Sequence, residues 1–197
     1  MILIASMFLV SIGYTMVIPF LPLYLLGIGV PEESIAIWTG VVFSSCFLVA
    51  GIMGPVWGKM ADTRGKKQMA IRAAVLLGFS SLFCGLSQNA WQMTAARAFM
   101  GFSNGFVAAS MAIISVSADP KNLGATLGMG QTALIVGGIA GPLVGGTLAH
   151  LIGIRNTFFI SAAFLWFVAE LVILYVREPK LGMVKKVESK ATTIGED

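Results

Sequence analysis

The chain has 197 residues, of which 57% are hydrophobic and 11% are charged, and its mean hydropathy is +0.88. Because soluble globular proteins carry about 25% charged residues, this composition excludes a chain whose surface faces only water. The formal net charge is +4, but the basic residues lie between apolar segments, which argues against a nucleic-acid partner. Cys46 and Cys84 fall inside apolar segments, so the sequence predicts neither a disulfide framework nor a metal site, and it indicates no cofactor.

Six apolar segments are each long enough to cross a lipid bilayer as a helix, which takes about 20 residues. They lack the alternating polarity of the roughly ten-residue strands of membrane barrels, so we expect an all-α membrane protein. The predicted helices cover residues 2–26, 34–57, 68–86, 90–116, 123–152 and 156–176. We expect them to form one six-helix bundle over residues 1–178, followed by a polar cytoplasmic tail over residues 179–197.

Basic residues indicate the side of the membrane on which each loop lies. The second loop and the tail carry most of them, at Lys59, Arg64, Lys66, Lys67, Arg177, Lys180, Lys185, Lys186 and Lys190. The first loop instead carries Glu32 and Glu33. Because Lys and Arg gather on the cytoplasmic side, the pattern predicts a multi-pass protein of the inner (plasma) membrane with both termini in the cytoplasm.

The first predicted helix contains two prolines, Pro19 and Pro22, which remove backbone donors within one turn. Such a helix is bent or broken, and a membrane tolerates it where it lines a cavity. Tyr14 is then a candidate polar residue of that lining.

The second predicted helix contains an eight-residue motif that returns in the fifth. Residues 51–58 and 138–145 share the pattern G-I-x-G-P-x-x-G, 87 positions apart. Because these two helices are expected to cross the membrane in opposite directions, the motif predicts an inverted repeat of three plus three helices. Chance recurrence is the alternative, since Gly and Pro are common in membrane helices.

The loop predicted after the second helix, residues 58–67, places an aspartate among several cations. Glycines in this stretch permit a tight reversal of the chain. Gly58, Asp62, Arg64, Gly65 and Lys66 therefore form a candidate conformational latch, held by charge-assisted bonds that break when the helices rock. A solvated basic loop that only sets the topology is the alternative.

Arg97 lies inside the fourth predicted helix, where burial of its charge costs about 2.5–3.5 kcal/mol on insertion scales. Met100 and Asn104 continue the same helical face. A face that mixes charge, amide and soft apolar groups is more typical of a cavity wall than of a lipid-facing surface. Tyr14, Met100, Asn104 and Gln131 are therefore candidates for a substrate path.

Glycines dominate one face of the fifth predicted helix. Gly137, Gly141 and Gly145 are four residues apart, so they lie on one face and let another backbone approach closely. With Pro142, which bends a helix, they predict a pivot or a barrier, and ordinary helix packing is the alternative.

In the sixth helix, Glu170 is a candidate proton carrier or partner of a cation, unless it reaches water at the cytoplasmic end.

Four of these elements together resemble the major facilitator superfamily, in its drug:proton antiporter branch. Residues 58–67 resemble its loop signature G-x-L-A-D-R-x-G-R-K, although Thr63 replaces the first arginine. Met93, Arg97, Met100 and Gly101 are spaced as in a helix-four signature with a buried arginine. Gly137, Gly141, Pro142, Gly145, Gly146 and Leu148 match the helix-five antiporter signature, and Ile12, Gly13, Pro19 and Pro22 resemble the helix-one signature of drug exporters.

The resemblance implies an alternating-access transporter in which inward proton flow drives outward movement of drugs or other amphipathic small molecules. It implies proton coupling through Arg97 and a latch role for Asp62, and we add Asp62 and Glu170 as candidate proton-coupling residues. Family members contain two six-helix halves, so the chain resembles an N-terminal half. We therefore expect it to work in a lipid bilayer with a second six-helix half or another copy of itself.

Three alternatives to drug export stay open. They are a transporter of sugars or metabolites on the same fold, an inactive half-transporter remnant, and an intramembrane serine protease suggested by G-x-S-x-G at residues 101–105. The protease is disfavoured because Ser103 is expected roughly 20 Å below the outer end of the fourth helix, at ~1.5 Å of rise per residue. His150, the single histidine, is expected near that outer surface, so we predict that the chain is not an enzyme.

Overall fold

The computed structural model describes residues 2–119 and 121–176, apart from the side chains of Asp62 and Arg64. All regular elements in these residues are helices, and six helical segments are long and apolar enough to cross a membrane. These segments cover Ile2–Gly27, Glu32–Ala61, Lys66–Leu86, Ala90–Ser117, Leu123–Ile152 and Ile154–Tyr175. The expected all-α membrane fold is therefore confirmed, while the tail predicted over residues 179–197 lies outside the described residues.

Two of the six segments are interrupted. The first consists of α1 (Ile2–Thr15), a 3₁₀ turn (Ile18–Phe20) and α2 (Leu21–Gly27), because Pro19 and Pro22 lack the N–H groups that would continue the helix. The fourth consists of α5 (Ala90–Ser103) and α6 (Phe106–Ser117). The span predicted over residues 90–116 agrees with the segment Ala90–Ser117. The helix within it is broken, because Asn104 is extended, with ψ 163°, and Gly105 adopts φ +126°.

The other segments are continuous helices: α3 (Ile35–Arg64, after a 3₁₀ turn at Glu32–Ser34), α4 (Lys66–Leu86), α7 (Leu123–Ile152) and α8 (Ile154–Tyr175). Because α3 continues to Arg64, the loop predicted over residues 58–67 is mostly helix. The chain reverses at Gly65 alone, where φ is +99°. Glycine and charge suggested a loop, but the Lys, Met and Ala residues between them are good helix formers.

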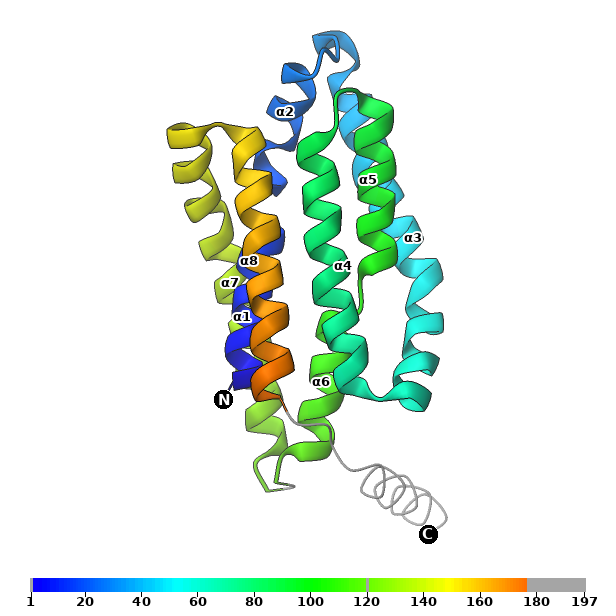
Figure 1. The fold of residues 1–197 in the computed structure, drawn as a ribbon, viewed down its shortest axis with the longest axis vertical. Coiled ribbons are helices and arrows are strands. Elements are labelled where there is room, and N and C mark those ends of the chain that lie inside the picture. The colour runs from blue at the N-terminus through cyan, green and yellow to red at the C-terminus, as the bar shows by residue number, and fades with distance from the viewer. Residues whose placement is uncertain (1, 120, 177–197) are drawn as a thin grey trace.

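The helices pack largely in pairs (Figure 1). α4 packs along α8, α1 along α7, and α3 along α5. α3 and α7 run in opposite directions, and the N-terminus and the end of α8 lie at the same end of the bundle. A two-fold relation between the first three and the last three spans would produce this pairing, so the arrangement is consistent with the predicted inverted repeat.

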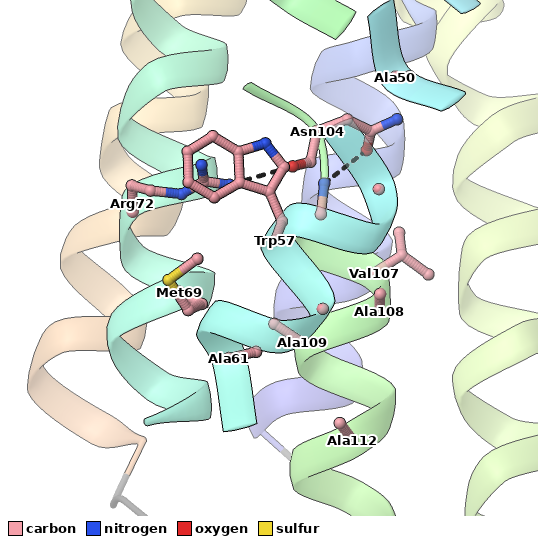
Figure 2. A pocket seen from close by; sticks show the side chains of 13 residues that line it. Ala50, Trp57, Ala61, Met69, Arg72, Asn104, Val107, Ala108, Ala109 and Ala112 are labelled. Carbon is pink, nitrogen blue, oxygen red and sulfur yellow. Dashed lines mark hydrogen bonds between the residues drawn. The ribbon is translucent and has the colours of Figure 1, made fainter. Parts of the chain in front are cut away.

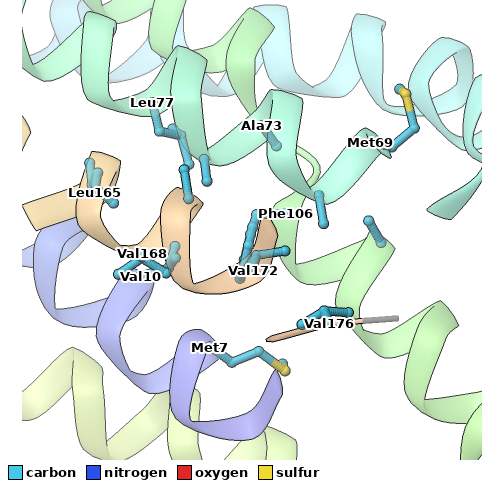
Figure 3. Close-up of a cluster of buried hydrophobic side chains, with 14 of the residues drawn as sticks. Met7, Val10, Met69, Ala73, Leu77, Phe106, Leu165, Val168, Val172 and Val176 are labelled. Atoms are coloured by element: carbon cyan, nitrogen blue, oxygen red, sulfur yellow. The ribbon is translucent and has the colours of Figure 1, made fainter. Parts of the chain in front are cut away.

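The largest hydrophobic core lies where α1, α4, α6 and α8 meet (Figure 3). Its buried side chains include Met7, Val10, Ala73, Leu77, Phe106, Leu165, Val168 and Val172. α3 and α7 are far less buried, because only 11% and 17% of their most apolar windows are covered, against 44% or more in the other spans. These two helices therefore present long apolar faces to lipid or to another protein.

Tyr24 ties the end of α2 to the end of α4. Its buried hydroxyl lies 3.0 Å from the Gly85 carbonyl and 3.1 Å from the Ser87 carbonyl, and it accepts a 3.4 Å hydrogen bond from Arg155 Nε. We expect Tyr24→Phe to lower the free energy of unfolding by about 1 kcal/mol, because buried carbonyls lose a donor. Thermal unfolding followed by circular dichroism measures this loss.

The exposed Tyr175 supplies the matched control, and Tyr175→Phe should leave the unfolding transition unchanged. Equal effects of the two substitutions would contradict a stabilising role for the Tyr24 hydroxyl.

Candidate functional site

A buried arginine lies inside the described bundle. Arg97 of α5 is 1% exposed, and its Nη1 donates to Met100 Sδ over 3.7 Å. Its guanidinium lies 5.9 Å from the Phe43 ring centroid, and Cys46 is within electrostatic reach. Within the described residues, Arg97 Nε and Nη2 have no hydrogen-bond partner. The fold therefore holds this cation among apolar, thiol and phenol groups, and no carboxylate among the described side chains offsets its burial.

Two local features of α5 place this arginine. The Asn89 side chain caps the helix by accepting a 2.9 Å hydrogen bond from the Gln92 N–H, which fixes where α5 begins. Gly101 lies against the backbone of Cys46 and Ala50, where any side chain would collide. α5 and α3 therefore approach closely, and this contact closes the space around Arg97.

A cavity of about 500 Å³ lies beyond the end of α5, between α3, α4 and α6 (Figure 2). We call it the α3–α6 cavity. Glycine and alanine form most of its wall, and Trp57, Arg72 and Asn104 supply its polar groups. Asn104, predicted to lie on a cavity wall, lines this one.

The break between α5 and α6 leaves carbonyl groups that no helical N–H can reach, and two side chains bind them. Trp57 Nε1 donates to the Phe102 carbonyl over 2.8 Å, and Arg72 Nη2 donates to the Asn104 carbonyl over 3.1 Å. The Arg72 guanidinium also lies 3.5 Å from the Trp57 ring centroid, in cation–π contact. These bonds fix the broken segment beside the cavity.

Sequence reasoning did not select Arg72. Arg72 lies inside the helix predicted over residues 68–86. A cation inside an apolar helix was the available signal. Its pairing with Trp57 depends on how α3 and α4 pack, and no spacing in the sequence indicates it.

The glycine face of α7, Gly137, Gly141 and Gly145, is packed directly on the backbone of α1. A side chain at these positions would meet the Phe8, Ile12 and Met16 carbonyls. Ser11 Oγ adds a 2.7 Å hydrogen bond to the Leu134 carbonyl across the same contact. Pro142 remains inside the helix, and Gly146 lies beside the Phe20 ring.

The first copy of the repeated motif is in a different environment. A Cβ atom added at Gly51, Gly54 or Gly58 of α3 would meet nothing within 4 Å. Gly54 and Gly58 line the α3–α6 cavity instead. Two stretches of the same sequence pattern therefore form a closed contact in α7 and an open wall in α3.

The remaining candidates for substrate path and proton coupling are dispersed. Tyr14 is half-buried in α1, within electrostatic reach of Arg97, and Met100 is buried against Arg97. Gln131 on α7 and Glu170 on α8 are both exposed. The structure thus brings Tyr14 and Met100 to the buried arginine and leaves Gln131 and Glu170 on the outside of the described bundle.

Part of the candidate latch can be located. Gly58 lies on the cavity wall, Gly65 forms the reversal, and Lys66 begins α4. The side chains of Asp62 and Arg64 lie outside the described residues. Within the described part of the chain, the candidate latch residues therefore lie at a helix–turn–helix corner.

The serine of the G-x-S-x-G stretch is fully buried. Ser103 Oγ donates to the Phe99 carbonyl over 2.7 Å and lies 3.1 Å from Ser80 Oγ. His150 is exposed near the end of α7. The serine hydroxyl is therefore engaged by its own helix and by α4, which is a packing role.

The sequence profile of the Major Facilitator Superfamily matches residues 3–196. The chain is 39% identical over 186 residues to the multidrug resistance protein MdtG of Proteus mirabilis, which covers 94% of this chain and 46% of that relative. It is 38% identical over 180 residues to MdtG of Yersinia enterocolitica, covering 91% of this chain and 44% of that relative. The chain thus spans less than half the length of these relatives.

Two solved structures share the fold at low sequence identity. The human organic anion transporter MFSD10 (TETRAN) superimposes with a TM-score of 0.74 and 18% identity, over 90% of this chain and 47% of that one. A D-xylose-proton symporter superimposes with a TM-score of 0.75 and 18% identity, over 99% of this chain and 52% of that one. In both comparisons the six-helix bundle corresponds to about half of the larger transporter.

Proposed function

Because the chain belongs to the Major Facilitator Superfamily, we propose that it forms one half of a proton-coupled exporter of drugs or other amphipathic small molecules. The MdtG relatives, which are multidrug resistance proteins, support this substrate class through 38–39% identity over more than nine-tenths of the chain. In this proposal the two halves rock about a central path, and proton entry drives substrate exit.

The observation that carries the proposal is the contact of the α7 glycine face with the α1 backbone. Gly137, Gly141 and Gly145 leave no space between the two helices, so water and protons cannot pass along this contact. An exporter driven by a proton gradient needs such a barrier, since a leak would dissipate the gradient that drives it. The same positions match the antiporter signature, with Pro142 and Gly146 completing it.

Arg97, Asp62 and Glu170 are the proposed proton-coupling residues, and Arg97 is the strongest of them. Its buried, unpaired charge is sensitive to any proton or carboxylate that enters its surroundings. Gly58, Asp62, Arg64, Gly65 and Lys66 remain the proposed latch. Tyr14, Met100, Asn104 and Gln131 remain the proposed substrate path.

The exposed faces of α3 and α7 support a paired assembly. Ile52, Val56, Ile139 and Leu143 are among the large apolar side chains on these helices with 45% or more of their surface exposed. A second six-helix half, or another copy of this chain, would cover part of these faces and complete a two-sided path. Lipid would cover the rest.

Dye efflux from cells tests the function. The chain is fused to the part of the Proteus mirabilis relative that it does not match. Efflux of two amphipathic dyes, the cation ethidium and the monoanion 8-anilinonaphthalene-1-sulfonate, is compared with and without a protonophore. We expect efflux above that of cells without the fusion, and we expect the protonophore to abolish it.

The D-xylose-proton symporter fold favours sugar transport as the second candidate. Proton-dependent xylose uptake without dye efflux would replace the export proposal with that candidate. Absence of both activities in a folded, membrane-inserted fusion would indicate an inactive remnant.

We further propose that the chain lies in the inner membrane with both termini in the cytoplasm. Glu32→Cys and Arg64→Cys place thiols at opposite ends of α3, whereas the native Cys46 and Cys84 are buried. A membrane-impermeant maleimide added outside intact cells should label Glu32→Cys and spare Arg64→Cys. Labelling of both from the outside would contradict this topology.

A further inference from the structure

We propose that the α3–α6 cavity binds the anionic group of an aromatic or similarly apolar small molecule, with Arg72 as the binding cation. The inference rests on the proposed export function and specifies its substrate class: amphipathic monoanions, such as aromatic carboxylates. Figure 2 shows Arg72 and Trp57 from neighbouring helices at the edge of the cavity.

The Arg72 charge is offset only in part by the described residues around it, through the Asn104 carbonyl and the Trp57 ring. Arg72 Nη2 donates to the Asn104 carbonyl, but within the described residues Nε and Nη1 have no partner and almost no contact with solvent. A guanidinium matches the geometry of a carboxylate better than any other side chain does. Because these two atoms are enclosed, a carboxylate in the cavity would not bond to them. It would instead offset the charge of the guanidinium, which lines the cavity.

Trp57 holds this cation in place. Its ring face lies against the guanidinium at 3.5 Å, and its N–H is engaged by the Phe102 carbonyl. The Trp57 side chain is therefore held at its indole N–H and at its ring face, and it holds the Arg72 guanidinium in turn. A cation fixed before the ligand arrives loses less conformational entropy on binding than a free one.

The wall of the cavity selects an anion with an apolar body. Among its described lining residues Arg72 is the one charged group, so the described wall offers no carboxylate that would attract a cation. Gly54 and Ala61 of α3 and Ala108 and Ala112 of α6 leave smooth apolar surface for a ring. The volume of about 500 Å³ falls inside the range of roughly 300–1,000 Å³ that is typical of small-molecule sites.

Arg97 cannot fill this role in the same conformation. It is 1% exposed and does not line the cavity, whereas Arg72 does. The two arginines are therefore separable by experiment, since Arg72 faces the cavity and Arg97 is enclosed by the α3–α5 contact.

Equilibrium binding to the 197-residue chain in phosphatidylcholine nanodiscs tests the inference. The probes are 2-naphthoate and 2-naphthylmethylammonium, which share a ring system and differ in charge. We expect the naphthoate to bind and the ammonium not to bind. Arg72→Gln should weaken naphthoate binding at least about tenfold, a factor that corresponds to one lost charge-assisted contact.

Lys121→Gln removes the same charge from an exposed position outside the cavity and should leave naphthoate binding unchanged. Equal binding of both probes, or equal binding by wild type and Arg72→Gln, would overturn the proposal. Repeating the titration in discs that contain phosphatidylglycerol separates a solute from a lipid headgroup. Unchanged affinity supports the solute, and a tenfold loss would overturn it in favour of the lipid.

A second experiment does not depend on the fold of an Arg72 variant. Ala108→Cys places a thiol on the exposed part of the cavity wall, and Ser117→Cys is the matched control on the same helix outside the cavity. An anionic methanethiosulfonate should modify the first faster than a cationic one, and 2-naphthoate should slow it. Equal modification rates of Ala108→Cys by the two reagents would contradict the inference. Equal protection of Ala108→Cys and Ser117→Cys by 2-naphthoate would contradict it too.

The two proposals fail in distinguishable ways. Naphthoate binding without dye efflux in the fusion would contradict the export function and leave the anion site standing. Efflux without naphthoate binding would contradict the anion site and leave the export function standing.

Discussion

Gly145→Ala is expected to lower the free energy of unfolding of the 197-residue chain by about 1–2 kcal/mol. The added methyl group would collide with the Met16 carbonyl, a backbone atom that cannot rotate away. α1 and α7 must therefore separate, and overpacking of this kind costs about 1–3 kcal/mol or more. The gain in helix propensity from Gly to Ala, about 1 kcal/mol, offsets part of the collision.

Gly58→Ala is the matched control, because Gly58 occupies the equivalent position in the repeated motif. Nothing lies within 4 Å of a Cβ atom there, so the propensity gain is unopposed and the substitution should be neutral or slightly stabilising. Chemical unfolding in detergent micelles, followed by circular dichroism, measures both effects. Equal destabilisation by the two substitutions would contradict the view that the close α1–α7 contact causes the effect of Gly145→Ala.

Arg97→Met is expected to change stability and function in opposite directions. Replacing an unpaired, buried charge by an apolar side chain of similar length should raise the free energy of unfolding by about 1–2 kcal/mol. In the fusion used for the efflux test, the same substitution should lower gradient-driven efflux at least about tenfold, because the proposed proton-coupling charge is gone. Arg97→Lys keeps the charge and should retain part of the efflux.

Opposite changes would separate a functional arginine from a structural one. A residue that only supports packing would lower stability and efflux together when replaced. Lys121→Met, at an exposed cation for which no side-chain bond is described, should alter neither quantity by much. Destabilisation by Arg97→Met would contradict the assignment, and so would unchanged efflux.

The sequence alone determined the membrane fold, because each of its signals is local. The length of an apolar run sets whether a helix can cross a bilayer, and the two prolines after Val17 break the first span whatever surrounds them. The spacing of Gly137, Gly141 and Gly145 placed them on one face of a helix before any partner was known. The break at Asn104–Gly105 was not predicted. A single glycine can continue a helix, and only the structure shows that Gly105 adopts a positive φ.

Only the tertiary structure decided what lies opposite each of these elements. The same glycine motif is closed against α1 in one half and open to a cavity in the other, since a motif cannot specify its neighbour. Arg72 and Trp57 belong to different helices, and their contact exists because α3 and α4 bring them together around the end of α5. The periodicity of a single helix determined which residues share a face. The packing between helices determined which of these faces became a barrier, a cavity wall or an exposed surface.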